Sequence, residues 1–446
     1  MHDRPAETAA AAPAREPAAG LAEATGADLA PGRPGLAARV RRVEGAPVVA
    51  VRLWLDAGTR VETYPGQGLL TGRMLEEGTR RRDWRRIAAD AEGRGMELSS
   101  FGAFEGHGVN VDALAPDWEL ALEWAAELLR EPSFPEERCA WLARQAAAEL
   151  EGMADQPDIK AAWGFLEHLY TPHPRCRPVH GNAASLSRIT AADCADLHGR
   201  ALAGGVIAAV AGMIDEDAVG RCLERLFGDL PPRRLPFPPP AAPEGLPSRR
   251  HQVAVESADQ AHLYIGHLTV RRRHPDYTAL ELLAVILGSG AGLTGRIPER
   301  IREREGLAYT AYAQTLAGAG EDPGRLVAYV ATSPDTAAQA ERGVAEEIAR
   351  LVEHGITDEE LEETRSYLLG REPFRRETAR QWADLLIEAE QYGLPLDDPF
   401  RRTADLRALD RRTCEAVARH HLRPEELRVT IGLPGRAPAH GPTGHP

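Results

Sequence analysis

Two stretches of this sequence repeat each other: RITAADCADLHGRALAGGVIAAVAG at residues 188–212 and RALDRRTCEAVARHHLRPEELRVTIG at residues 407–432. Each has the pattern of a short helix, a turn and a strand that ends at glycine. The aligned pairs are Ile189 and Leu409, Cys194 and Cys414, Leu202 and Leu422, Ile207 and Leu427, and Gly212 and Gly432. The second stretch therefore reads as a copy of the first.

A second pair of matching segments lies closer to the start of each half. VVAVRLWLDAG (48–58) precedes the apolar segment GLLTGRMLEEGT (68–79), and AHLYIGHLTV (261–270) precedes TALELLAVILGSG (278–290). In both places a strand pattern leads into a helix pattern. Two matches in the same order indicate a duplicated domain.

Each half mixes strands and helices, and short turns separate neighbouring strands. This arrangement predicts antiparallel pairing with helices on one face, which is an α+β domain. The fold we expect is two homologous domains, each a mainly antiparallel sheet covered by helices. The predicted strands are 47–55, 96–103, 106–114, 205–213, 252–257, 261–270, 307–315, 325–332 and 426–432.

Composition sets the domain boundaries. Both ends are rich in Ala, Pro and Gly and lack apolar periodicity, so we expect them to be disordered. A proline-rich stretch in the middle reads as a semi-rigid linker. The predicted divisions are 1–35 (disordered), 36–229 (first domain), 230–250 (linker), 251–432 (second domain) and 433–446 (disordered tail).

Net charge argues against two classes of partner. Lys and Arg total 53 and Asp and Glu total 67, a formal net charge of −14. Nucleic acids and anionic membranes both attract basic surfaces, so we expect neither as a partner. No run of 18 apolar residues and no secretory signal occurs, and the 5 cysteines form no C-x-x-C. We therefore expect a cytoplasmic protein with free thiols.

Two further motifs are expected to have a structural role and no function of their own. GAGLTG at 290–295 matches a dinucleotide-binding pattern, but a helix rather than a strand precedes it, so we expect a turn between helices. His420 and His421 lie near Glu425 and Glu426 and are expected to form a solvated helix end rather than a site.

Three segments resemble insulinase-type (pitrilysin-type) zinc metallopeptidases. GSGAGLTGRIPERIREREGLAYT (288–310) resembles that family's second-half signature. GQGLLTGRMLEEGT (66–79) resembles its first-half zinc helix, and FPEERCAWLARQAAAELEGMADQP (134–157) resembles the helix that carries its third zinc ligand. The resemblance spans roughly residues 45–433 and implies a clamshell of two related domains.

The zinc motif of that family is missing here. Active members carry His-x-x-Glu-His where this chain has Leu69-Leu-Thr-Gly-Arg73, and Glu149 stands at the third ligand position. One carboxylate cannot hold a catalytic zinc, which needs three protein ligands. We therefore expect no metal and no cofactor in this chain, and no cleavage by it alone. Arg73 is hypothesised to pair with Glu149 in place of the metal.

The second half retains a pair that the family uses to grip substrate. By resemblance, Arg302 and Tyr309 are the expected substrate-binding residues, because both can donate hydrogen bonds to a peptide carbonyl. The alternative is a surface arginine and a half-buried tyrosine without a role. Arg304 is the residue that a wrong register would select instead.

The resemblance implies the non-catalytic subunit of a heterodimeric zinc endopeptidase. The expected partners are a His-x-x-Glu-His-bearing homologous subunit, which holds the zinc, and a peptide substrate. The peptide would add a strand to a sheet edge, which by resemblance lies near residues 95–105 in the first half. The alternatives are a purely structural or assembly homologue, an active peptidase with an unorthodox metal site, and a nucleotide-dependent enzyme.

Overall fold

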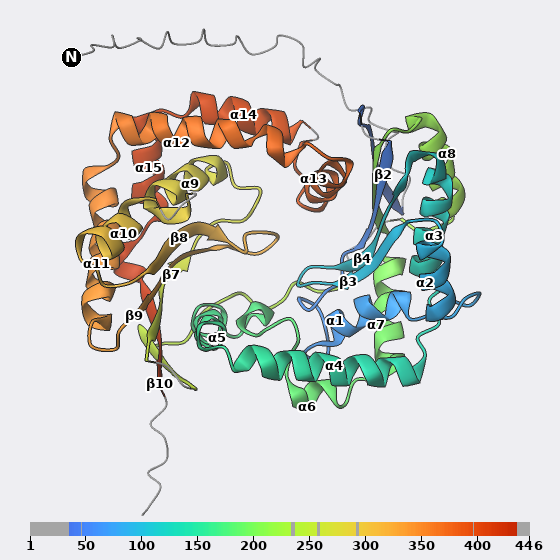
Figure 1. The fold of residues 1–446 in the computed structure, drawn as a ribbon, viewed down its shortest axis with the longest axis horizontal. Coiled ribbons are helices and arrows are strands. Elements are labelled where there is room, and N and C mark those ends of the chain that lie inside the picture. The colour runs from blue at the N-terminus through green and yellow to red at the C-terminus, as the bar shows by residue number, and fades with distance from the viewer. Residues whose placement is uncertain are drawn as a thin grey trace, which may run out of the picture.

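The computed structural model describes residues 35–45, 47–232, 237–256, 259–290, 294–395 and 397–434. They form two five-stranded sheets that stand on opposite sides of the molecule (Figure 1). Each sheet has three antiparallel pairings and one parallel pairing. The predicted α+β fold of two mainly antiparallel sheets covered by helices is confirmed.

The first half begins at Leu36 and ends with a helix at Phe227. Its elements are β1 (Leu36–Arg42), β2 (Val48–Leu55), α1 (Gln67–Arg73), α2 (Trp84–Glu92), β3 (Glu97–Gly102), β4 (His107–Leu114), α3 (Trp118–Arg130), α4 (Glu136–Ala154), α5 (Pro157–Tyr170), α6 (Ala183–Leu186), α7 (Ala191–Ala203), β5 (Val206–Gly212) and α8 (Glu216–Phe227).

The second half repeats this order. Its elements are β6 (Arg250–Val255), β7 (Ala261–Leu268), α9 (Tyr277–Ala284), α10 (Arg296–Pro298), β8 (Thr310–Ala317), β9 (Arg325–Thr332), α11 (Ala337–His354), α12 (Asp358–Arg371), α13 (Ala379–Gln391), α14 (Asp398–Ala408), α15 (Arg411–His421) and β10 (Arg428–Pro434). The helix at α10 continues with wider, π-type turns as far as Arg304.

Strand order and register confirm the duplication. The sheets have the orders β1-β5-β2-β4-β3 and β6-β10-β7-β9-β8, which are the same topology. Gly212 faces Val49 in the first sheet, and Gly432 faces His262 at the corresponding place in the second. The sequence alignment of Gly212 with Gly432 is therefore also a structural alignment.

The structure adds one strand that the sequence pattern does not predict. β1, with the sequence LAARVRR, lies at the edge of the first sheet and pairs in parallel with β5. Its three arginines hide the apolar alternation that marks a half-buried strand. The counterpart β6 pairs in parallel with β10.

The ends predicted to be disordered lie mostly outside the described residues, whereas most of the predicted semi-rigid linker is described. Residues 1–34 and 435–446, and residues 233–236 of the linker, lie outside the described part. Residues 237–249 contain no helix or strand, and β10 extends to Pro434. Within the described part of the chain, no helix is long and apolar enough to cross a membrane.

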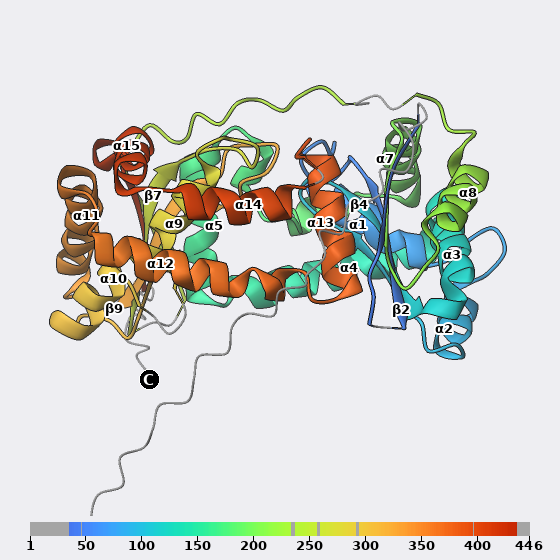
Figure 2. The same cartoon turned by 90° about the horizontal axis from the view of Figure 1, so that it is seen from above.

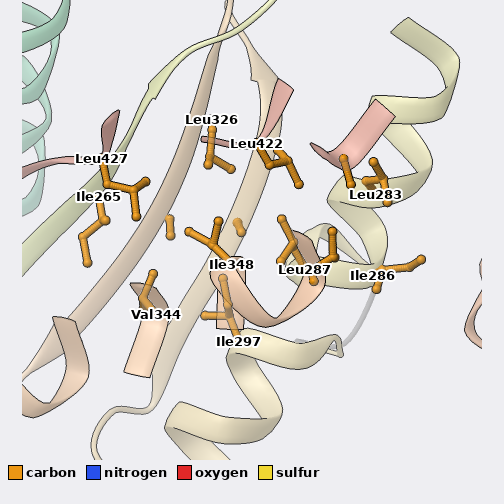
Figure 3. Close-up of a cluster of buried hydrophobic side chains, with 14 of the residues drawn as sticks. Ile265, Leu283, Ile286, Leu287, Ile297, Leu326, Val344, Ile348, Leu422 and Leu427 are labelled. Atoms are coloured by element: carbon orange, nitrogen blue, oxygen red, sulfur yellow. The ribbon is translucent and has the colours of Figure 1, made fainter. Parts of the chain in front are cut away.

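Each sheet packs its outer face against helices of its own half. In the second half, α9 and α11 supply Leu283, Val344 and Ile348 to a core that also includes Ile265 and Leu326 of the sheet (Figure 3). In the first half, α3 and α8 play this part, with Leu122, Leu129 and Leu223 fully buried. The apolar faces of these helices therefore form two separate hydrophobic cores.

The inner face of each sheet is covered by a helix from the other half. Helix α5 belongs to the first half but packs on β6, β7 and β10, where Phe165 stacks on Tyr264. Helix α13 belongs to the second half but packs on β1, β2 and β5 (Figures 1 and 2). Trp382 of α13 is buried there with Ala50 and Ala211. This exchange of equivalent helices ties the two halves together by hydrophobic burial.

Two acidic side chains reinforce this tie where the β3–β4 and β8–β9 turns meet. Glu105 accepts hydrogen bonds from the Tyr392 hydroxyl at 2.7 Å and the Glu321 backbone N–H at 3.0 Å. Asp322 accepts from Arg60 at 2.7 Å and lies 3.2 Å from His173 Nε2. Burial raises the pKa of Asp322, but the bonds from His173 and Arg60 outweigh it and hold that pKa well below its usual range.

We expect Asp322→Asn to lower the free energy of unfolding by about 1–3 kcal/mol, because Arg60 loses its charge partner and Asp322 is buried. The effect should be largest at neutral pH and fade as the pH falls below about 3.8, where the unfolded carboxyl also becomes protonated. Chemical denaturation at several pH values measures this. Asp196→Asn is the matched control, since Asp196 is 69% exposed in a surface pair with Arg200; an equal effect of both changes contradicts the prediction.

Candidate functional site

Helix α1 carries the residues that align with the zinc motif, and its apolar side chains face inward. Leu69 is 6% exposed and packs with Cys139 and Leu142 of α4 in a hydrophobic cluster. Leu70 and Met74 are fully buried in the same cluster. The position where the family has its first histidine is therefore part of a hydrophobic contact between α1 and α4.

The remaining space at α1 is closed by close backbone packing on the edge strand β3. A Cβ added at Gly72 would lie 2.1 Å from the carbonyl oxygen of Phe101, far inside contact distance. One turn earlier, a Cβ at Gly68 would lie 2.6 Å from backbone atoms of Gly58 and Thr59. Gly72 aligns with the family's catalytic glutamate, so a carboxylate there would require β3 to move.

Arg73 and Glu149 form an ion pair where the metal ligands of the family align. Arg73 Nη2 donates to Glu149 Oε2 at 2.8 Å, so the pairing hypothesised from the sequence is confirmed. The hydrogen bond from Arg73 lowers the pKa of Glu149 below its ordinary value. His180 Nε2 lies 3.3 Å from the same oxygen. His180 lies on the connection between α5 and α6, and no motif in the sequence pointed to it.

This group of residues does not fit a catalytic zinc. It offers one carboxylate and one imidazole, whereas a catalytic zinc needs three protein ligands and an open position. The Arg73 guanidinium also brings a permanent positive charge against the carboxylate that the metal would need. We derive no step through a metal at α1.

Arg302 and Tyr309 lie together on the second half. The Arg302 guanidinium carbon is 5.1 Å from the centre of the Tyr309 ring, a cation–π distance. Tyr309 is 78% exposed, so the alternative of a half-buried tyrosine is wrong. Arg304 instead pairs with Glu299 at 2.6 Å. The geometry thus associates Arg302, and not Arg304, with Tyr309.

Buried isoleucines anchor the helix that carries Arg302 to the core of the second half. Ile297 and Ile301 are fully buried in the second core, and Figure 3 shows Ile297 among Leu287 and Ile348. The preceding turn uses glycines with positive φ, at Gly288 (150°) and Gly295 (120°). Gly295 ends the expected turn at 290–295 and begins α10, although residues 291–293 lie outside the described part. This anchoring leaves Arg302 and Tyr309 on the surface, directly before the edge strand β8.

A cavity of about 380 Å³ lies at the seam between the halves. Its wall includes Trp54 of β2 and Phe101 of the edge strand β3, whose rings lie 5.4 Å apart. Helix α13 contributes Asp384 and Gln391 from the opposite side. A peptide strand added to the β3 edge would run beside this cavity, because side chains on the same face of the sheet as Phe101 project toward the cavity.

The two groups of candidate residues are separate in this chain. Among the described residues, no hydrogen bond or ion pair joins Arg302 or Tyr309 to Arg73, Glu149 or His180. A single chain thus presents one exposed arginine–tyrosine pair and one closed position whose residues do not fit a catalytic zinc.

The family models match both halves. The model described as insulinase (peptidase family M16) matches residues 40–172, and the model described as the peptidase M16 inactive domain matches residues 203–368. The chain therefore belongs to peptidase family M16, as the resemblance implied.

Curated relatives and solved structures agree on the family. An uncharacterized zinc protease of Mycobacterium leprae is 30% identical over 356 residues, which are 77% of this chain and 78% of the relative. The non-peptidase homolog YmxG of Helicobacter pylori is 23% identical, over 74% of this chain and 76% of its own. The crystal structure of a peptidase M16 inactive domain from Pseudomonas fluorescens has a TM-score of 0.83 and 25% identity, and the match covers 91% of this chain and 97% of that one.

We expect Gly72→Ala to lower the free energy of unfolding by about 1–3 kcal/mol, because the new methyl group meets the backbone of Phe101. Thermal and urea unfolding measure the change. Gly152→Ala in α4 is the matched control, since a Cβ there meets nothing within 4 Å. That control should be neutral or stabilising by up to about 1 kcal/mol, because alanine favours a helix. If Gly72→Ala behaves like the control, the position has room for a side chain and the closed-site description is wrong.

Proposed function

We propose that this chain is the non-catalytic subunit of a heterodimeric M16 endopeptidase. In this proposal it holds a peptide through Arg302 and Tyr309, and a homologous subunit with a His-x-x-Glu-His motif supplies zinc and cleaves the peptide. The observation that carries the proposal is the contrast between the closed position at Gly72 and Arg73 and the exposed pair on the second half.

The chemistry of the pair fits the recognition of a peptide backbone. A guanidinium offers five N–H donors in a fixed plane and a phenol offers one O–H, while peptide carbonyls are acceptors. Arg302 is 34% exposed on its side chain and its nearest carboxylate, Glu303, is 3.4 Å away, so donors remain for a ligand. The Tyr309 ring is 78% exposed, so a ligand can reach it.

The edges of the two sheets support an extended substrate. β3 and β8 are the outermost strands of their sheets, and an edge strand can pair with an added peptide through main-chain hydrogen bonds. Tyr309 immediately precedes β8, which would place the pair beside a peptide aligned with that edge. In this proposal, the cavity near Phe101 accommodates one substrate side chain.

The comparisons support a two-part enclosure. This chain matches the structure of the periplasmic protease PqqL from Escherichia coli with a TM-score of 0.75, but the match covers only 44% of that longer chain. The rest of the PqqL chain is therefore long enough to contain a second unit of this size. We also propose a cytoplasmic location, which the five free cysteines support.

The alternative is a structural homologue without a role in proteolysis. The name of the H. pylori relative, non-peptidase homolog, favours it. The two functions differ in what they require of Arg302 and Tyr309. A subunit that holds substrate needs both side chains, whereas a structural protein needs neither for its role.

We expect this chain to associate with a zinc-bearing homologue from the same host more tightly than with itself. The exposed edges and the uncovered pair are surfaces that a partner would cover. Sedimentation of an equimolar mixture should show one species near twice the mass of a single chain. Two separate monomers in the mixture would end the subunit hypothesis.

Arg302→Ala should reduce kcat/KM of the assembled complex by about 10–100-fold, because hydrogen bonds to a charged donor contribute about 1.5–3 kcal/mol. Tyr309→Phe removes only the hydroxyl and tests the donor apart from the ring. Assembly should be unchanged in both variants. Arg304→Ala is the matched control and should be near neutral, because Arg304 pairs with Glu299. Unmodified cleavage by both Arg302 and Tyr309 variants would favour the structural alternative.

A further inference from the structure

A cluster of metal-ligating side chains lies on the second half, away from α1. His274 and Asp276 lie on the connection between β7 and α9, and His421 is the last residue of α15. One ligand atom from each of the three residues lies within 4.8 Å of the other two. Helices α9 and α15 pack together, which brings these residues into contact although they are far apart in the sequence (Figure 2).

The contacts within the cluster are close and specific. His421 Nε2 lies 2.7 Å from Asp276 Oδ2, and His274 Nδ1 lies 3.9 Å from the same oxygen. The rings of His274 and His421 meet edge to face at 5.1 Å. His421 is only 11% exposed on its side chain, so the sequence expectation of a solvated helix end is wrong for this residue.

Asp276 contacts His421 instead of capping the N-terminus of helix α9. It occupies the N-cap position of α9, where an aspartate normally accepts a hydrogen bond from the first helical turn. Here its side chain makes no such bond and faces His421 instead. The backbone N–H of Asp276 donates to His274 Nδ1 at 3.1 Å, which fixes the orientation of that ring.

The surrounding charge also suits a cation. His421 closes α15, and the C-terminus of a helix carries partial negative charge that favours cations. The charged groups that act on the His421 ring are Asp276, His420 and His274. The cluster thus contains three imidazoles and one carboxylate, and an imidazole becomes a metal ligand only when it is neutral.

We propose that His274, Asp276 and His421 bind one divalent transition-metal ion of the zinc class. Two imidazoles and one carboxylate are a ligand set that suits Zn²⁺. Ligand atoms about 2.0–2.2 Å from a tetrahedral zinc lie about 3.3–3.6 Å from one another. The two separations from Asp276 Oδ2, 2.7 and 3.9 Å, lie on either side of this range. Small side-chain rotations bring the three atoms to such an ion, with His274 Nδ1 exchanging its backbone bond for the metal.

The ion would link two helices of the second half. It would join the start of α9 to the end of α15, two helices that supply Leu280, Leu283, Cys414 and Val417 to the second core. Its location is distinct from the family's zinc position at α1, where the ligands are missing.

The test is a titration of the metal-free full-length chain with Zn²⁺ by calorimetry and with Co²⁺ by visible absorption. We expect one ion per chain and a Zn²⁺-dependent rise in melting temperature, because a ligand that binds only the folded state stabilises it. Asp276→Asn and His421→Gln should each weaken binding by at least about 10-fold, since each removes a ligand. Asp276→Asn keeps the size of the side chain, so it tests the carboxylate without a packing change.

Two substitutions serve as controls. His354→Ala removes a surface histidine that is 73% exposed and should leave binding unchanged. Glu149→Ala should also leave it unchanged, which separates this site from the α1 position. Failure to reach one ion per chain, unaltered binding by the Asp276 and His421 variants, or loss of binding in Glu149→Ala would each overturn the proposal.

Discussion

The exchange of helices α5 and α13 between the halves is the interaction on which the rest of the structure depends. Each sheet needs a cover on its inner face, and each receives it from the opposite half. Phe165 and Leu169 lie on the second sheet, and Trp382 and Ala383 lie on the first. Burial of this kind is non-directional and strong, so the halves cannot separate without exposing both inner faces to water. The polar contacts at Glu105 and Asp322 then fix the orientation of two units that hydrophobic burial already holds together.

Within this fixed arrangement, the packing of α1 determines whether the position of the zinc motif is open. In the first half, α1 is packed between α4 and the edge strand β3, with Gly72 against the backbone of Phe101. The metal position is thus closed by packing and by the Arg73–Glu149 pair, and not only by the loss of histidines. On the second half, the buried Ile297 and Ile301 hold Arg302 at the surface. One duplicated fold therefore presents a closed position on one half and an exposed arginine–tyrosine pair on the other.

Much of the fold was predictable because it depends on local patterns. Strand periodicity located nine of the ten strands found in the described part of the chain, and the alignment of Gly212 with Gly432 gave the correct structural equivalence. β1 was missed because its arginines hide the alternation and because parallel pairing with β5 is a long-range contact.

The candidate site was predictable only where residues align with a family motif. Arg73 and Glu149 were paired correctly on that basis. His180 and the contact of Gly72 with Phe101 were not, because both depend on how distant segments approach in space. The same reason explains His421, whose partner Asp276 lies on a different element. Sequence spacing carries information about one element at a time, and these contacts join two.

The central claim is that this chain contributes to proteolysis without performing it. The most direct measurement is hydrolysis of a set of fluorogenic peptides by three samples: this chain alone, a His-x-x-Glu-His homologue from the same host alone, and their equimolar mixture. The account predicts cleavage by the mixture and little or none by either chain alone. Equal cleavage by the homologue with and without this chain, or cleavage by this chain alone, would contradict it.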